Sequence, residues 1–150
     1  MMSAKNDLKV SVIQTKLMWQ DPEKNRQHFS EIMAALKGTT DLIVLPEMFT
    51  TGFTMTPENL AETMDGETVC WLKQQAEKLE AAVCGSVAML VDGAFVNRLL
   101  FVSPDGQVQC YDKRHLFRMG NEHEHFAQGQ QRKIFDYCGW KILASVCYDL

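Results

Sequence analysis

The sequence predicts an α/β protein in which helices pack against a mixed β-sheet. Two observations support this prediction. The first 80 residues alternate strand-like and helix-like segments, an order typical of parallel strands joined by helices. From residue 81 onward, strand-like segments follow one another across Asp-Gly turns, which favours antiparallel hairpins. No repeat, low-complexity tract or linker divides the sequence, so we expect a single domain over 1–150.

The first strand and the first helix have clear local signals. Residues 8–15, LKVSVIQT, form a β-rich run that is typical of a strand. Asp21 is a suitable N-cap for the next segment, and Pro22 suits the first helical position. Apolar residues recur three and four positions apart through 21–38, which predicts an amphipathic helix that ends at Gly38.

The remaining elements follow in the same way. Residues 41–46, DLIVLP, are a continuous apolar run typical of a strand buried on both faces. After a loop, residues 67–80 have helical apolar spacing. The later strand-like segments are 81–90, 94–104, 108–113, 132–137 and 141–150. Three tryptophans lie in or beside apolar segments and are expected in the core: Trp19, Trp71 and Trp140.

Composition excludes several classes of protein. The net charge is −4 and no long basic cluster occurs, which argues against a nucleic-acid-binding surface. No apolar stretch approaches the ~20 residues that span a bilayer, and the polar N-terminus lacks a signal-peptide pattern. The five cysteines form no CxxC pair, which favours reduced thiols. We therefore expect a cytoplasmic protein with no membrane or nucleic-acid partner.

Three reactive groups follow predicted strands. Glu47 comes directly after 41–46, Lys113 ends the segment 108–113, and Cys147 follows the apolar part of the last segment. Taken singly, the glutamate and the lysine are more simply read as solvated side chains, whereas for the cysteine core packing and a reactive role are equal alternatives. In α/β sheets, however, ligands bind at the carboxyl ends of strands. The combination therefore predicts one site.

The chemistry of these groups is complementary. An ammonium beside a thiol favours the thiolate, so we expect an acidic Cys147. A carboxylate can accept the thiol proton and later activate water. An ammonium, with a backbone N–H, can stabilise the oxyanion of a tetrahedral intermediate. Together, Glu47, Lys113 and Cys147 predict an acyl-transfer hydrolase that needs no histidine.

Three segments, LPEMFTTGF, YDKRHLF and SVCYDL, resemble the signature segments of the nitrilase superfamily of carbon–nitrogen hydrolases. The family order of glutamate, lysine and cysteine corresponds to Glu47, Lys113 and Cys147. The resemblance implies an α-β-β-α sandwich with mixed sheets. Family members continue well past the cysteine, so we expect this chain to be the N-terminal portion of a longer enzyme. Its sandwich is then expected to be incomplete, and the chain alone is expected to be an incomplete enzyme.

The resemblance also implies further site residues. Family members carry a second glutamate between the lysine and the cysteine, and Glu122 matches it better than Glu124 does. Where the family commonly has proline before the glycine that corresponds to Gly129, this chain has Gln128. The backbone N–H of Tyr148 is implied as an oxyanion donor.

The PEMFTTGF segment resembles the bacterial omega-amidase branch, which hydrolyses the side-chain amide of 2-oxo acids such as 2-oxoglutaramate and releases ammonia. The resemblance implies a small-molecule amide and water as partners, a homo-oligomer of two or more subunits, and neither cofactor nor metal. Phe49 and Phe53 are candidates to line a small acyl pocket, with loop packing an equal alternative. Another amidase, a nitrilase or a carbamoylase remains an alternative.

Three other functions stay open. A cysteine–histidine hydrolase would use one of the histidines between Lys113 and Cys147, although the HEH segment, 123–125, is expected to be a polar loop and no orienting asparagine or aspartate is evident. A metal site there would lack the paired histidine spacing of a zincin. An inactive fragment or protein-binding module is the third alternative. The histidines concerned are His115, His123 and His125.

Overall fold

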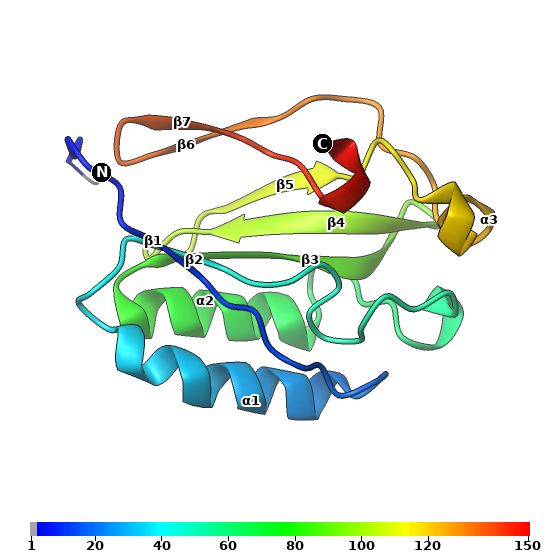
Figure 1. Ribbon diagram of the computed structural model, residues 1–150, viewed down its shortest axis with the longest axis horizontal. Helices are drawn as coiled ribbons and strands as arrows, with labels where there is room; N and C mark the ends of the chain where they lie inside the picture. The colour runs from blue at the N-terminus through cyan, green and yellow to red at the C-terminus, as the bar shows by residue number, and fades with distance from the viewer. Residues whose placement is uncertain (1–2) are drawn as a thin grey trace.

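The structure is a computed structural model that describes residues 3–150, and it has three layers (Figure 1). Two helices, α1 (Pro22–Met33) and α2 (Glu67–Leu79), cover one face of a five-stranded sheet, and a two-stranded sheet covers part of the other face. The predicted α/β class with a mixed sheet is confirmed. The described residues supply one helix layer and two β-layers of the expected sandwich.

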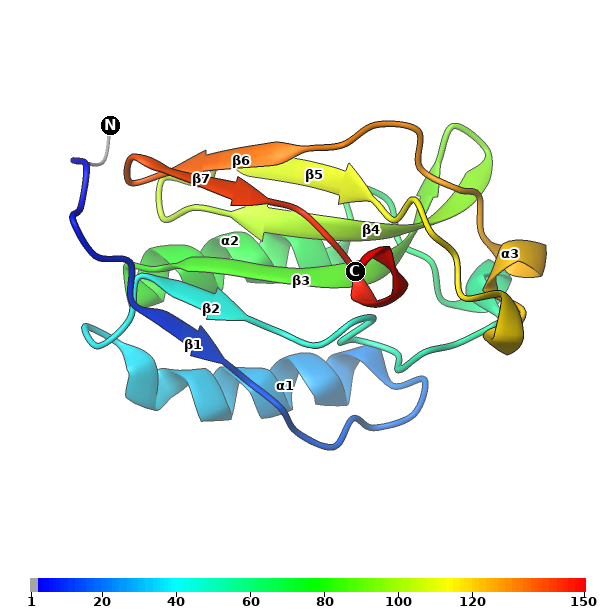
Figure 2. The ribbon, with the colours of Figure 1, turned by 45° about the horizontal axis from the view of Figure 1, so that its top comes forward.

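The five-stranded sheet combines parallel and antiparallel pairing, in the order β1-β2-β3-β4-β5 (Figure 2). Its strands are β1 (Val10–Val12), β2 (Leu42–Val44), β3 (Ala82–Val91), β4 (Ala94–Val102) and β5 (Val108–Asp112). The first three are parallel, as expected for strands linked through helices, and the last three pair antiparallel across short turns. Both halves of the sequence prediction therefore hold.

The second sheet is the hairpin of β6 (Ile134–Tyr137) and β7 (Trp140–Leu143). Aromatic side chains join it to the larger sheet: the ring of Phe101 on β4 lies 5.1 Å from that of Phe135 and 5.4 Å from that of Tyr137, between centroids. The chain runs directly from β7 toward Cys147, so this packing also sets where the cysteine lies (Figure 2).

Local signals explain the helices. The Asp21 carboxylate accepts a hydrogen bond from the Lys24 N–H at 3.1 Å, and Pro22 is the first residue of α1, as predicted. The helix ends at Met33, and a 3₁₀ turn, η1 (Ala34–Leu36), continues toward Gly38. The main core fills the space between these helices and the sheet, with fully buried side chains such as Phe29 and Leu72.

Two local expectations are wrong. Residues Glu122–His125 form a short helix, α3, after the 3₁₀ turn η3 (Arg118–Gly120), and are not an open loop. Trp19 and Trp140 are not core residues, since 63% and 40% of their surfaces are exposed. The Trp19 ring instead lies over Gly52, where an added Cβ would come within 2.8 Å of it. The remaining 3₁₀ turns are η2 (Pro57–Asn59) and η4 (Cys147–Asp149).

None of the helices formed by residues 3–150 is long and apolar enough to cross a membrane.

Candidate active site

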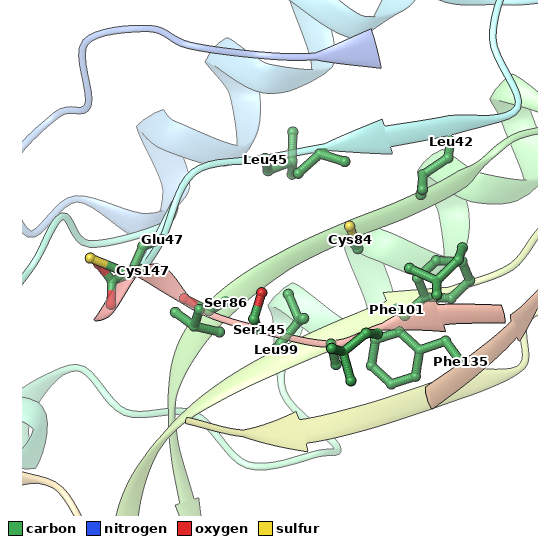
Figure 3. Close-up of a pocket in the computed structure, with 15 residues that line it drawn as sticks. Leu42, Leu45, Glu47, Cys84, Ser86, Leu99, Phe101, Phe135, Ser145 and Cys147 are labelled. Carbon is green, nitrogen blue, oxygen red and sulfur yellow. The ribbon is translucent and has the colours of Figure 1, made fainter. Parts of the chain in front are cut away.

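The three residues singled out by the sequence lie at one end of the space between the two sheets. Glu47 follows β2, Lys113 follows β5 directly, and Cys147 begins η4 after β7. Glu47 and Cys147 line the same cavity of about 280 Å³, and Figure 3 shows them side by side at its end. Lys113 reaches this point by bonding to Glu47, so the structure brings all three together.

A buried lysine links two carboxylates. Lys113 Nζ donates to Glu47 Oε1 at 2.8 Å and to Glu122 Oε2 at 2.9 Å. The Lys113 and Glu122 side chains are fully buried, while 20% of the Glu47 side chain is exposed. Burial lowers the pKa of Lys113, but the hydrogen bonds and charges of the two glutamates outweigh it and leave that pKa above its ordinary value. The lysine is therefore a cation with one N–H to spare.

Glu122 has both carboxylate oxygens occupied. Its Oε2 also accepts from the Phe117 N–H at 2.7 Å, and its Oε1 accepts from Asn97 Nδ2 at 3.0 Å. Because each oxygen already has a donor, this buried carboxylate is suited to hold Lys113 and poorly suited to accept a proton from a ligand. Glu124 is exposed, so the structure places Glu122, and not Glu124, against the lysine.

Asn97 is a site residue that the sequence analysis missed. It lies on β4, is fully buried, and donates through Nδ2 to Glu47 Oε1 at 2.9 Å as well as to Glu122. A signal was present in the sequence, since Asn97 and Arg98 are the polar residues of the otherwise apolar AFVNRLLFV run. A buried amide needs polar partners, which here are the two glutamates.

Cys147 stands on a backbone turn with an unusual conformation. Its φ is +46°, in the left-handed region that non-glycine residues rarely adopt, and such residues cluster at functional sites. Asp149, another residue missed by the sequence analysis, holds this turn. Its carboxylate accepts from the Val146 N–H at 3.0 Å, the Tyr111 hydroxyl at 2.7 Å and the His115 N–H at 2.9 Å. The turn is thereby tied to the end of β5, where Lys113 lies.

The thiol is less acidic than the sequence led us to expect. Burial raises the pKa of Cys147, and the adjacent negative charge of Glu47 raises it further, while the charge of Lys113 only partly offsets both. The expectation of an acidic thiol is wrong because the carboxylate and the partial burial act against the lysine. The resting site holds a protonated thiol beside a carboxylate that can accept its proton.

Of the remaining predicted residues, Tyr148 and Phe53 lie beside the site, and Phe49 does not. The backbone N–H of Tyr148 lies within hydrogen-bonding reach of the Cys147 sulfur and lowers the thiol pKa. The Phe53 ring centroid lies 5.6 Å from Lys113 Nζ, so Phe53 borders the site. Phe49 does not line the cavity. It is fully buried in the core beneath the sheet, edge-on to Phe29, so the pocket role expected for it is not supported.

The structure bears on two of the alternative functions, the cysteine–histidine hydrolase and the metal site. Contrary to expectation, His115 does have an aspartate partner, since its Nδ1 lies 2.9 Å from Asp149 Oδ1. Its ring, however, borders a separate cavity with Arg114 and Arg118, and the charges that act on the thiol come from Glu47 and Lys113. Among residues 3–150, no three His, Cys, Asp or Glu side chains converge in the manner of metal ligands.

Comparisons with known proteins agree on one family. The family model described as carbon-nitrogen hydrolase matches residues 9–150. The omega-amidase YafV of Yersinia enterocolitica is 45% identical over 145 residues, which are 95% of this chain and 55% of that protein. The 2-oxoglutaramate amidase of Bacillus subtilis is 28% identical over 144 residues, 94% of this chain and 56% of that protein.

A solved structure shows the same fold. XC1258 from Xanthomonas campestris, described as a CN-hydrolase superfamily protein with an arsenic adduct in its active site, superposes with a TM-score of 0.94 at 46% identity. The match covers 97% of this chain and 55% of XC1258. The chain thus spans about half the length of the relatives it matches. By sequence and by fold, the chain belongs to the carbon–nitrogen hydrolase family.

Proposed function

We propose that the full-length protein containing this chain is an omega-amidase that hydrolyses the terminal amide of a 2-oxo acid, such as 2-oxoglutaramate, through a thioester on Cys147. The observation that carries the proposal is the junction of a thiol, a carboxylate and a buried ammonium at the end of one cavity. The similarity to the omega-amidase YafV and to the 2-oxoglutaramate amidase of Bacillus subtilis supports the choice of substrate.

The acylation half-reaction uses all three groups. The proton of the Cys147 thiol passes to Glu47, and the sulfur attacks the amide carbon to form a tetrahedral intermediate. The new oxyanion accepts the third N–H of Lys113 Nζ and the backbone N–H of Tyr148. As the carbon–nitrogen bond breaks, Glu47 returns the proton to the leaving nitrogen. Ammonia departs and a thioester remains.

In the deacylation half-reaction, water is the nucleophile and the thiol is the leaving group. Glu47 takes a proton from water, and the resulting hydroxide attacks the thioester carbon. When the carbon–sulfur bond breaks, the proton on Glu47 returns to the sulfur, so the site is restored. The net reaction consumes one amide and one water and yields one carboxylic acid and one ammonia. Glu122 keeps Lys113 charged and in place throughout.

The cellular setting and assembly are also part of this proposal. All five cysteines are free thiols in the structure, which supports a reducing compartment such as the cytoplasm. A homo-oligomer of the full-length protein is proposed from the family resemblance. The chain is proposed to be the N-terminal portion of one hydrolase domain, consistent with its covering about half of its relatives' length.

A substrate panel tests the proposal. The full-length protein is incubated with 2-oxoglutaramate, succinamate, aliphatic nitriles and N-carbamoyl amino acids, and ammonia release is measured. We expect the 2-oxo acid amide to give the highest kcat/KM. Cys147→Ala is expected to be inactive, whereas Cys70→Ala, which removes another exposed thiol, should retain full activity. Preference for nitriles or carbamoyl compounds would assign another branch, and full activity in Cys147→Ala would contradict the mechanism.

A further inference from the structure

Asn97 is bound to the candidate site through both its backbone and its side chain. On β4 it pairs with Ala88 of β3, and its carbonyl oxygen accepts the Lys113 N–H at 2.9 Å. Its side chain is fully buried and lies between the two carboxylates that contact the lysine. The mechanism proposed above gives this residue no role.

The orientation of the Asn97 amide is dictated by the carboxylates. Nδ2 donates one N–H to Glu47 Oε1, at 2.9 Å, and the other to Glu122 Oε1, at 3.0 Å. The other end of the amide, Oδ1, has no hydrogen-bond partner among residues 3–150 although it is buried. Rotating the amide by half a turn would set Oδ1 against two negative charges. The observed orientation therefore gives a hydrogen bond to each glutamate and leaves Oδ1 without one.

The two oxygens of Glu47 are treated unequally. Both Lys113 Nζ and Asn97 Nδ2 donate to Oε1, at 2.8 and 2.9 Å. Oε2 is left free of both donors and can face the thiol. A lysine alone would not fix this arrangement, because its ammonium is a rotatable point charge and the terminal torsion of a glutamate is broad. A second donor, held by a β-strand, restricts the rotation.

We propose that Asn97 is a positioning residue that holds Oε1 of Glu47 in place so that Oε2 is directed at the proton of Cys147. Asn97 does not touch the substrate and acts only through Glu47. The inference rests on the proposed roles of Glu47 and Cys147 in amide hydrolysis. It adds a fifth polar side chain to Glu47, Lys113, Cys147 and Glu122, and it explains why a buried amide lies on this strand.

The change that tests this is Asn97→Ala in the full-length protein. We expect kcat to fall by about 10- to 100-fold, the range typical of residues that orient catalytic groups, with KM changed by less than about threefold. The pH profile of Cys147 alkylation by iodoacetamide should also move to lower pH. The reason is that Oε2 of Glu47, no longer held against the thiol, loses the hydrogen bond that raises the thiol pKa.

Two further variants separate positioning from simple damage. Gln75→Ala removes another buried amide, one that donates to Ser30 Oγ at 3.2 Å between the two helices, and should leave the alkylation profile unchanged. Asn97→Asp keeps the shape but replaces the donor with a third carboxylate, whose negative charge should move the profile upward, in the opposite direction from Asn97→Ala. If Asn97→Ala does not fold, as judged by its thermal melt, Asn97→Asp carries the test.

The outcomes are distinct. A wild-type alkylation profile in the folded Asn97 variants, or an equal change in Gln75→Ala, would overturn the inference. Alkylation needs no substrate, so it is independent of the proposed activity. If the wild-type protein releases no ammonia from any amide while the Asn97 profile still shifts, the omega-amidase proposal fails and the positioning role of Asn97 stands.

Discussion

Opposing charges surround the Cys147 thiol. Burial raises its pKa most, Glu47 raises it further and Lys113 lowers it, so the net pKa lies above the ordinary value of 9.0. In the proposed mechanism, this nucleophile is not a preformed thiolate. It depends on proton transfer to Glu47 at the moment of attack, which ties the reactivity of the sulfur to one neighbouring oxygen.

Replacing Glu47 with glutamine should change the acidity of the Cys147 thiol and the turnover of substrate in opposite directions. Glu47→Gln removes the negative charge that disfavours the thiolate, so the alkylation profile of Cys147 should move to lower pH. The same change removes the proton acceptor, so kcat should fall by about 10²- to 10⁴-fold. Parallel alkylation and ammonia assays check both effects. A thiol profile that moves upward, or turnover that stays near wild type, would contradict the assignment of Glu47 as the base.

Removing the Lys113 charge should cost both activity and stability. Lys113→Met takes away an oxyanion donor, for which about 10²- to 10³-fold in kcat is typical. It also strands Glu122 and Glu47 without their cation, and breaking a buried ion pair costs about 3–5 kcal/mol. Urea unfolding and ammonia assays measure the two losses. As a control, Lys37→Met breaks only an exposed pair with Glu80 and should change the free energy of unfolding by less than about 1 kcal/mol.

The turns after the strands, more than the strands themselves, give the site its geometry. Two residues of these turns, Met48 and Cys147, lie in the left-handed region, each with φ of +46°. Met48 directly follows Glu47, and Cys147 is the proposed nucleophile itself. Asp149 fixes the second turn against β5. Gly129 lets the chain after α3 cross the end of that strand, because an added Cβ there would lie 2.0 Å from the Asp112 carbonyl oxygen.

Asp149 makes the nucleophile turn sensitive to acid. Burial raises its pKa, but hydrogen bonds from Tyr111, Val146 and His115 together bring it below the ordinary value of 3.8. A carboxyl with a lowered folded-state pKa contributes stability that is present above pH 3.8 and is lost as the pH falls through the folded value. The free energy of unfolding of Asp149→Asn should therefore fall less in acid than that of the wild type.

The measurement is urea unfolding at pH 7 and at about pH 3, with ammonia release at pH 7. Asp149→Asn should also lower kcat, since the turn that carries Cys147 is no longer tied to β5. Asp105 is a suitable comparison because its pKa is likewise lowered, by the Ser103 hydroxyl, in the turn between β4 and β5, at the end of β5 opposite Lys113. Asp105→Asn should keep full activity. Equal activity in the two variants would refute the role given to Asp149.

The sequence predicts the elements better than the connections between them. Strand and helix patterns were sufficient for the mixed sheet, because hydrophobic periodicity and capping residues are local signals. The motifs were sufficient to single out Glu47, Lys113 and Glu122. Asn97 and Asp149 were missed because their importance lies in which distant groups they meet. The thiol pKa was misjudged because it depends on burial and on the relative proximity of two opposite charges.

Across the molecule, the site depends on how the two sheets pack. Glu47 and Lys113 follow strands of the larger sheet, whereas Cys147 follows β7 of the smaller one. The thiol therefore meets its partners only if the hairpin is correctly placed over β4. Phe101 and Phe135 provide much of this contact, and both are almost completely buried.

Weakening this contact should affect the reactive groups at the other end of the cavity that Phe101 and Phe135 also line. Phe135→Ala should lower the free energy of unfolding by about 3–5 kcal/mol, as is typical when a buried phenylalanine is truncated. It should also slow amide hydrolysis, because β7 and the following turn lose their support. Phe135→Leu, which keeps an apolar side chain there, should lose less of both. Urea unfolding with kcat measurement checks this, and normal kcat in a destabilised Phe135→Ala would argue against coupling of the sheets to the site.

The most direct test of the account is to capture the covalent intermediate. Full-length protein mixed with 2-oxoglutaramate or succinamate is quenched in acid, and the mass of the intact chain and of its peptides is measured. We predict an acyl group, equal to the substrate less ammonia, on the peptide containing Cys147 and on no other cysteine. An acyl group on another residue, or ammonia release at the wild-type rate from Cys147→Ala, would contradict the account.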